Sequence, residues 1–153
     1  MSEEAKTKAG IAEEEMRTLV VERVFPYARE KLWRALTESA LLAQWMMKND
    51  FEPVVGRKFQ FRADPAPNWN GIVDCEVRVV EPLQRLSYIW GVGAGEAELQ
   101  WVVLWTLTQV EGGTHLRMEQ SGFRPDQKQA YGGAKYGWQK FFGDLERLIG
   151  GLE

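Results

Sequence analysis

The chain has 153 residues, 44% of them hydrophobic, so we expect one domain with a sizeable buried core. Its formal net charge of −3 comes from the first 15 residues, which hold five glutamates and two lysines, because the other 138 residues balance at 17 acidic and 17 basic. This balance argues against a nucleic-acid partner, and the lack of an apolar run of about 18 residues argues against a membrane span.

The chain begins with a polar stretch, residues 1–16, which we interpret as a flexible acidic tail. The remainder, residues 17–153, is expected to form a single domain. Within it, residues 18–27 are rich in β-forming side chains and predict a first strand, which Pro26 ends.

Two short helices are expected directly after this strand. Leu32, Trp33 and Leu36 lie at helical spacing and predict a helix over 29–36. A second helix is expected over 37–45, with Thr37 or Ser39 as its N-cap. One strand followed by two short helices is an unusual opening for a domain.

From residue 51 to residue 123 the hydrophobic pattern changes to a period of two, which predicts about six antiparallel strands. Turns are expected at 64–68, 81–82 and 111–113, and a flexible glycine loop at 91–95. No helix follows that loop, so it is not a phosphate cradle. The apolar side chains expected on the inner face include Phe59, Phe61, Val73, Cys75, Val77, Val79, Leu86, Tyr88, Trp90, Leu116 and Met118.

The predicted strand over 99–110 differs from the others because both of its faces are apolar. Trp101, Val103, Trp105 and Leu107 form one face, while Val102 and Leu104 lie on the other. A strand of this kind is usually covered on both sides. We therefore expect either the acidic tail or a second copy of the chain, in a homodimer, to cover the outer face.

The last 28 residues predict a long amphipathic helix. Such a helix needs a concave sheet to pack against, so the predicted fold class is α+β, with a cavity between sheet and helix. Gly132, Gly133 and Gly137 disfavour a helix, and close approach to a strand or to a ligand would explain them. The apolar face of the helix is expected to comprise Tyr131, Ala134, Trp138, Phe141, Leu145, Leu148 and Leu152.

This order of elements resembles the START-like (SRPBCC, Bet v 1-like) helix-grip superfamily, and more closely the branch named after the heat-shock protein 90 ATPase activator homologue. The matching segments are residues 22–25, 32–37, 42–45, 55–59, 81–90, 112–116 and 133–138, with Gly71 opening a strand. The resemblance implies a curved antiparallel sheet that grips the C-terminal helix around an internal pocket. It also implies a small apolar or aromatic ligand, and some relatives catalyse cyclisation or hydrolysis.

One position departs from the family pattern. Many relatives carry a histidine near the end of the strand after the Gly-Thr turn, where this chain has Gln120. Gln120 shares the inward parity of Leu116 and Met118. A glutamine can donate and accept hydrogen bonds, but it cannot act as a base at neutral pH.

Few residues offer acid–base, nucleophilic or metal chemistry. The single histidine, His115, has the parity of the solvated face, and the single cysteine, Cys75, is interpreted as a small buried hydrophobe. A lone cysteine also fits a reducing, cytoplasmic compartment. We expect no metal and no cofactor, and the residue types favour a binding protein over an enzyme.

The aromatic content is the positive signal, because seven tryptophans are many for this length. Wide, flat side chains suit a pocket for a flat apolar ligand, with tyrosine and glutamine as orienting groups, although each could simply fill the core. Lys135 could meet a carboxylate or lie at the surface. The expected ligand-binding residues are Trp45, Phe59, Phe61, Trp69, Tyr88, Trp90, Trp105, Met118, Gln120, Tyr131, Lys135 and Trp138.

The sequence therefore predicts a carrier, sensor or stress-related protein that binds a small hydrophobic molecule. The first alternative is a cyclase or hydrolase that acts on a polyketide-like substrate. The second alternative is a regulator of a chaperone ATPase, which only the family name suggests.

Overall fold

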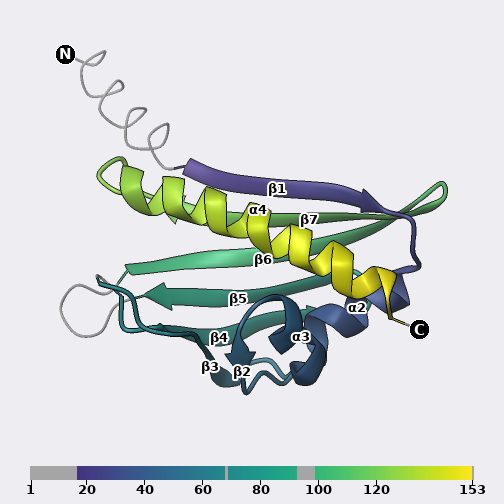
Figure 1. Ribbon diagram of the computed structural model, residues 1–153, viewed down its shortest axis with the longest axis horizontal. Coiled ribbons are helices and arrows are strands. Elements are labelled where there is room, and N and C mark those ends of the chain that lie inside the picture. Colours follow the sequence, from purple (N-terminus) through teal and green to yellow (C-terminus); the bar gives the residue numbers. More distant parts are fainter. Residues whose placement is uncertain (1–16, 68, 93–98, 153) are drawn as a thin grey trace, which may run out of the picture.

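The computed structural model describes residues 17–67, 69–92 and 99–152, and it confirms the predicted α+β architecture (Figure 1). Seven strands form one antiparallel sheet in the order β1-β7-β6-β5-β4-β3-β2. The strands are β1 (Arg17–Phe25), β2 (Lys48–Asn49), β3 (Lys58–Arg62), β4 (Ile72–Glu81), β5 (Arg85–Val92), β6 (Leu99–Val110) and β7 (Gly113–Phe123). The described helices are α2 (Arg29–Thr37), α3 (Ser39–Trp45) and α4 (Lys128–Gly150), and none of them is long and apolar enough to cross a membrane.

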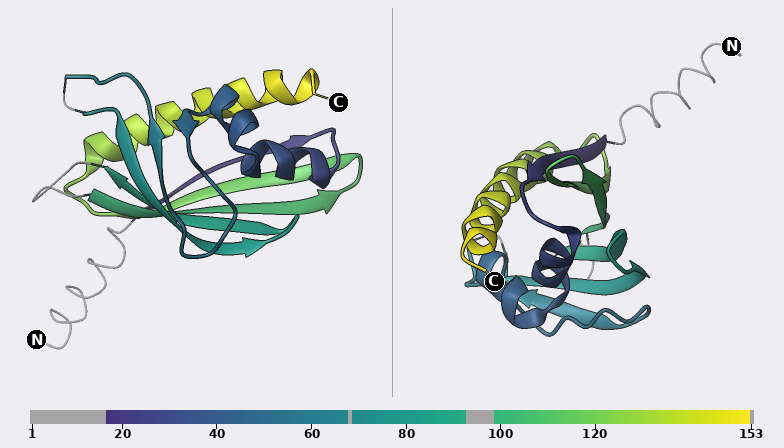
Figure 2. Two further views of the ribbon diagram at one scale, coloured as in Figure 1. Left: turned by 90° about the horizontal axis from the view of Figure 1, so that it is seen from below. Right: turned by 90° about the vertical axis from the view of Figure 1, so that its right-hand side faces the viewer.

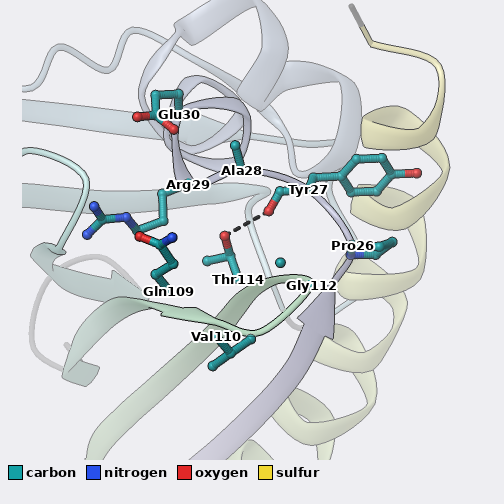
Figure 3. Close-up of a pocket in the computed structure, with 10 residues that line it drawn as sticks. Pro26, Tyr27, Ala28, Arg29, Glu30, Gln109, Val110, Gly112 and Thr114 are labelled. Atoms are coloured by element: carbon teal, nitrogen blue, oxygen red, sulfur yellow. Dashed lines mark hydrogen bonds between the residues drawn. The ribbon is translucent and has the colours of Figure 1, made fainter.

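The chain turns sharply after β1, where Pro26 cannot donate a ladder hydrogen bond. The β6–β7 hairpin packs closely against this corner (Figure 3). Thr114 Oγ1 donates a hydrogen bond to the Tyr27 carbonyl at 2.8 Å. A Cβ added to Gly113 would lie 2.0 Å from the carbonyl oxygen of Phe25, so only glycine fits there.

The two short helices are present as predicted, but the predicted cap is wrong. The N-cap of α3 is Glu38, which makes no capping hydrogen bond with its side chain. The Thr37 hydroxyl instead donates to the Trp33 carbonyl at 2.6 Å, and the Ser39 hydroxyl donates to the Asn49 carbonyl at 3.0 Å. The Thr37 bond therefore stays within α2, the Ser39 bond ties α3 to β2, and neither hydroxyl caps the start of α3.

The predicted inner face of β4 is wrong beyond Val77, because the register of the strand shifts there. The pairing with β5 is irregular between Val77 and Val79, so that Val80, and not Val79, lies opposite the buried Leu86. Val80 packs against the core as a result. An extra residue of this kind reverses the alternation beyond it, and a strict period of two cannot reveal it.

Helix α4 lies on the concave side of the sheet (Figure 2). Its four buried residues are Trp138, Phe142, Leu145 and Ile149. Trp138 and Leu145 of the predicted apolar face are buried, and its half-buried members Tyr131, Ala134, Phe141 and Leu148 pack against the core. The prediction missed Phe142 and Ile149, which are also buried. Besides the sheet interior, α4 contacts α2, α3 and the edge strand β1.

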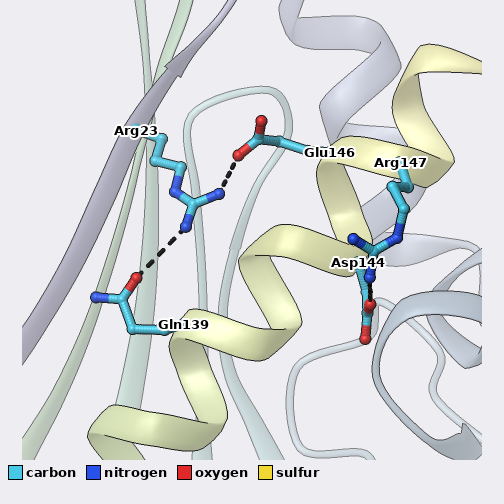
Figure 4. Close-up of polar contacts among 5 residues, drawn as sticks. All are labelled: Arg23, Gln139, Asp144, Glu146 and Arg147. Atoms are coloured by element: carbon cyan, nitrogen blue, oxygen red, sulfur yellow. Dashed lines mark hydrogen bonds and ion pairs between the residues drawn. The ribbon is translucent and has the colours of Figure 1, made fainter.

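Polar contacts also fasten α4 to the edge strand β1 (Figure 4). Arg23 forms an ion pair with Glu146, and its guanidinium lies 5.7 Å from the ring centre of Phe142. A second contact joins Arg23 to Gln139 Oε1 at 3.4 Å. Exposed ion pairs contribute little individually, so burial of the helix face dominates its attachment.

The prediction that the outer face of β6 is covered agrees only in part with the structure. Val102 is 39% exposed and Leu104 is half-buried. One predicted cover, the tail at 1–16, lies outside the described residues, and the homodimer stays a prediction. The predicted glycine loop is wrong at its start, because β5 continues to Val92, and its remainder also lies outside the described residues.

Candidate functional site

A cavity of about 580 Å³ lies between the sheet and the N-terminal half of α4. Its walls come from the inner face of the strands, from the segment after α3 and from one side of α4. Most of the lining side chains are apolar or aromatic. They are Met46, Met47, Ala63, Trp69, Val73, Trp90, Val92, Leu99, Trp101, Gln120, Ala130, Gly133, Ala134, Gly137, Trp138, Lys140 and Phe141.

The helix leaves room for this cavity because two of its lining positions carry no side chain. Gly133 and Gly137 are one turn apart, and a Cβ added to either would meet no atom within 4 Å. Close approach of these glycines to a strand is therefore excluded for the described residues. Farther along the helix, Phe142 and Leu145 fill the corresponding space and close the core.

Gln120 is the buried polar group of the cavity. Its side chain is 1% exposed and projects from the inner face of β7. Trp138 Nε1 of α4 donates a hydrogen bond to Gln120 Oε1 at 2.7 Å. This bond fixes the orientation of the amide, because an indole N–H can only donate.

Two other tryptophans of the lining also have hydrogen-bonded indoles. Trp69 Nε1 donates to the Ile72 carbonyl at 3.1 Å, and Trp101 Nε1 donates to Gln127 Oε1 at 3.3 Å. These bonds hold the rings in place and satisfy their N–H groups within the protein. The two rings therefore offer the cavity apolar surface.

The structure brings four of the twelve predicted ligand-binding residues together at the cavity: Trp69, Trp90, Gln120 and Trp138. The rings of Trp90 and Trp138 lie 5.2 Å apart with an interplanar angle of 49°. One of these residues is in β5 and the other is in α4. They form adjoining walls, one from the sheet and one from the helix.

Six of the predicted residues are packed in the core and do not line the cavity: Trp45, Phe59, Phe61, Tyr88, Trp105 and Met118. Trp105 Nε1 donates to the Tyr88 hydroxyl at 2.9 Å, and Trp45 Nε1 donates to the Ala35 carbonyl at 2.9 Å. Burial raises the pKa of the Tyr88 phenol, so this hydroxyl stays neutral. It serves the core as a hydrogen-bond partner.

The last two predicted residues lie away from the cavity. Tyr131 lines a separate hollow of about 480 Å³, where the guanidinium of Arg17 lies 5.2 Å from the centre of its ring. Lys135 is exposed and does not line the cavity. The lysine that does so is Lys140, whose Nζ lies 3.6 Å from a carboxylate oxygen of Asp144.

The prediction omitted several lining residues that carried a signal in the sequence. Trp101 shares the parity of Trp105 and faces inward as that parity requires. Met46 and Met47 directly follow α3, and adjacent methionines commonly adapt to irregular apolar surfaces. Gly133 and Gly137 disfavour a helix, and their spacing of about one turn is a sequence signal for an opening on one side of it.

Few of the described side chains that line the cavity are ionisable. Within residues 17–67, 69–92 and 99–152, Lys140 is the one lining residue with an ionisable side chain. Burial, followed by the nearby carboxylates of Asp74 and Asp50, raises the pKa of the Cys75 thiol, which makes it inert as a nucleophile. His115 Nε2 lies 2.8 Å from Glu22 Oε1 on the solvated face, and no described histidine, cysteine or carboxylate cluster could hold a metal ion.

A further hollow, of about 420 Å³, lies at the opposite end of the sheet (Figure 3). It is bordered by the turn between β6 and β7 and by the start of α2. Arg29, Glu30 and Gln109 give it a polar rim, and the ring of Tyr27 extends toward α4. It lacks the enclosing aromatic walls of the larger cavity, which is therefore the better candidate site.

Comparisons with known proteins agree with this fold. A family model described as "Activator of Hsp90 ATPase homolog 1-like protein" matches residues 26–150. The crystal structure of protein MLL2253 from Mesorhizobium loti is similar, with 53% sequence identity and a TM-score of 0.83, over 90% of this chain and 99% of that chain.

Two further structures are more distant. A protein from Rhodobacter sphaeroides is 26% identical with a TM-score of 0.70, over 89% of this chain and 93% of that chain. DynU16, a protein in the dynemicin biosynthetic locus, is 27% identical with a TM-score of 0.73, over 88% of this chain and 47% of that chain. A comparison with curated proteins gives no match.

Proposed function

This chain belongs to the Activator of Hsp90 ATPase homolog 1-like family, and on that premise we propose that it binds a small hydrophobic or aromatic molecule between the sheet and α4. The observation that supports the proposal most directly is the apolar cavity of about 580 Å³. That volume lies within the range of about 300–1,000 Å³ that is usual for small-molecule sites.

The lining supplies a plausible source of affinity. A ligand that buries roughly 200 Å² of apolar surface gains about 5 kcal/mol at ~25 cal/mol per Å². Trp69, Trp90 and Trp138 supply broad aromatic faces for that burial. Part of this gain offsets the loss of translational and rotational freedom, so we expect generic probes to bind in the submillimolar to millimolar range.

The scarcity of ionisable groups at the cavity favours a carrier or sensor over an enzyme. General acid–base catalysis needs a group that exchanges a proton near neutral pH, and Lys140 is the single ionisable residue among the lining residues that the structure describes. The second candidate is a cyclase or hydrolase that shapes a polyketide-like substrate. The similarity to DynU16, from a biosynthetic locus, supports that candidate.

The first test is native mass spectrometry of freshly purified protein, followed by analysis of an organic extract. We expect a reproducible additional mass, and the extract would identify its chemical type. A protein that loses its ligand during purification is tested by titration with N-phenyl-1-naphthylamine, a neutral probe whose fluorescence rises in an apolar site.

Two adjacent glycines provide a matched pair of variants for both measurements. Gly133→Leu places an isobutyl group at the cavity wall, whereas Gly132 does not line the cavity. A Cβ at either position meets no atom within 4 Å, so both variants should fold. We expect Gly133→Leu to weaken binding at least tenfold and Gly132→Leu to leave it unchanged. Equal binding by both variants would contradict the proposed site.

A further inference from the structure

We propose that the molecule held in this cavity is neutral and carries a carbonyl oxygen, and that Gln120 Nε2 donates a hydrogen bond to that oxygen. This inference rests on the proposed function and specifies the ligand class of the same site. Gln120 would then select the carbonyl group of the ligand within an otherwise apolar cavity.

The carbonyl of the Gln120 side chain is already occupied. Gln120 Oε1 accepts the N–H of Trp138 at 2.7 Å, which places the NH₂ group at the other end of the amide. An amide with the opposite orientation would face two donors toward each other. The structure therefore determines which half of the amide is available for a ligand.

The NH₂ group has no acceptor among the described residues. No hydrogen bond is donated by Gln120 Nε2, although the residue is 1% exposed overall. Every fully enclosed side-chain nitrogen or oxygen of the described chain has a partner, so this nitrogen must reach open space. Gln120 lines the cavity, and that is the open space available to it.

A buried amide donor without a partner is unfavourable, and a ligand acceptor would relieve that cost. Water could meet the same need in the empty cavity, and an incoming ligand would have to displace it. A hydrocarbon that displaces such a water leaves the donor unpaired, whereas a carbonyl compound replaces the lost hydrogen bond. The cavity should therefore discriminate between the two.

The other polar groups that could orient a ligand are already used. The Tyr88 hydroxyl accepts from Trp105 Nε1 in the core, at 2.9 Å. Trp69 and Trp101 donate to protein acceptors, as described above. Gln120 is thus the buried donor in the lining whose hydrogens have no described acceptor.

The ligand is inferred to be neutral because no charged group lies beside Gln120 among the described residues of the lining. Lys140 is the single ionisable residue of that described set, its side chain is 66% exposed, and its ammonium already faces Asp144 at 3.6 Å. A carboxylate held deep in the cavity would be desolvated without a counter-charge, which is costly. A ketone, quinone or ester oxygen accepts the same hydrogen bond without that cost.

The test uses two probes of nearly equal shape, 2-acetylnaphthalene and 2-isopropenylnaphthalene, in which a carbonyl oxygen is exchanged for a methylene group. Their binding to the wild-type protein and to Gln120→Met is measured by equilibrium dialysis. Methionine preserves the length of the side chain but removes the whole amide, both its donor and the oxygen that accepts from Trp138 Nε1. The comparison is therefore repeated in a Trp138→Phe background, where no freed indole N–H can replace the lost donor. We expect the ketone to bind about threefold to tenfold more weakly to the variant, while the hydrocarbon is unaffected or binds more tightly.

An equal change in affinity for both probes, or no change in affinity for either, would overturn the carbonyl inference while leaving the proposed function intact. Failure of both probes to bind the wild-type protein would contradict the proposed function as well. Should Gln120→Met fail to fold, infrared spectroscopy of 2-acetylnaphthalene bound to the wild type gives an independent answer. A carbonyl stretch at lower frequency than in cyclohexane supports the hydrogen bond, and an equal frequency overturns it.

Discussion

Trp138 of α4 donates its indole N–H to the side-chain carbonyl of Gln120 on β7, over a distance of 2.7 Å. The bond joins the C-terminal helix to the inner face of the sheet beside the cavity. Trp138 is 2% exposed and contacts the rings of Trp90 and Trp105. It therefore belongs to the core and to the cavity wall at once.

We predict that Trp138→Ala lowers the free energy of unfolding by about 3–5 kcal/mol, because a large buried side chain is lost and its cavity stays open. Urea denaturation followed by circular dichroism measures this. Tyr136→Ala on the same helix is the control, since Tyr136 is 76% exposed. A Trp138→Ala protein of unchanged stability that merely lost its ligand would rule out the core role.

Because Tyr88 and Trp105 share a hydrogen bond, we expect their substitutions to be coupled in their effects on the free energy of unfolding. Tyr88→Phe leaves the indole N–H of Trp105 buried without its acceptor, so we expect a loss of about 1–3 kcal/mol. Adding Trp105→Phe removes the stranded donor, and the double variant should be more stable than the two single losses together suggest. Simple additivity in the double-mutant cycle would show that the bond contributes little.

Glycine-to-alanine substitutions should have opposite signs at two positions. Gly143→Ala is expected to stabilise the protein by about 0.5–1 kcal/mol, because alanine favours a helix and its Cβ meets no atom within 4 Å. Gly113→Ala should destabilise it, because the new Cβ would lie 2.0 Å from the Phe25 carbonyl oxygen. Thermal unfolding distinguishes the two, and a shift in the same direction for both would refute this explanation.

Because the thiol of Cys75 is buried, we expect the protein to lose stability at alkaline pH. The pKa of Cys75 is raised above its usual value of 9.0, chiefly by burial. Above that pH the unfolded chain loses the thiol proton and the folded chain keeps it. The unfolded state then binds fewer protons, so the free energy of unfolding falls by up to ~1.4 kcal/mol per pH unit.

The variant Cys75→Ala tests this linkage. Denaturation at a series of pH values from about 9 to 11 should give a shallower decline than in the wild type, because one proton no longer contributes. Near neutral pH the two proteins should differ only by a constant offset. An identical decline in both proteins would mean that the thiol titrates normally when folded.

Most of the fold could be predicted from local patterns. Alternation in the strands placed Phe59, Trp105 and Met118 on the inner face, and helical spacing identified the two short helices and the long one. Local patterns failed where one extra residue shifted the register, at Val77 to Val79. They also missed Phe142 and Ile149 on the buried side of α4, because the width of that side depends on its neighbours in space.

The candidate site was less predictable than the core. Parity could place an aromatic residue inside, but it could not separate a cavity wall such as Trp90 from core filling such as Trp45. Both kinds of residue are apolar and face inward. Which one borders empty space depends on the side chains opposite, and these belong to distant segments of the chain.

The sequence by itself determined the family, the element order and the apolar interior, because these follow from periodicity, turn residues and short motifs along the chain. Only the tertiary structure decided where the interior stays open. That opening requires Gly133 and Gly137 of α4 to face strands that start tens of residues earlier. Likewise, the free donor of Gln120 emerges only when Trp138 is brought against its carbonyl, since hydrogen-bond satisfaction depends on neighbours in space.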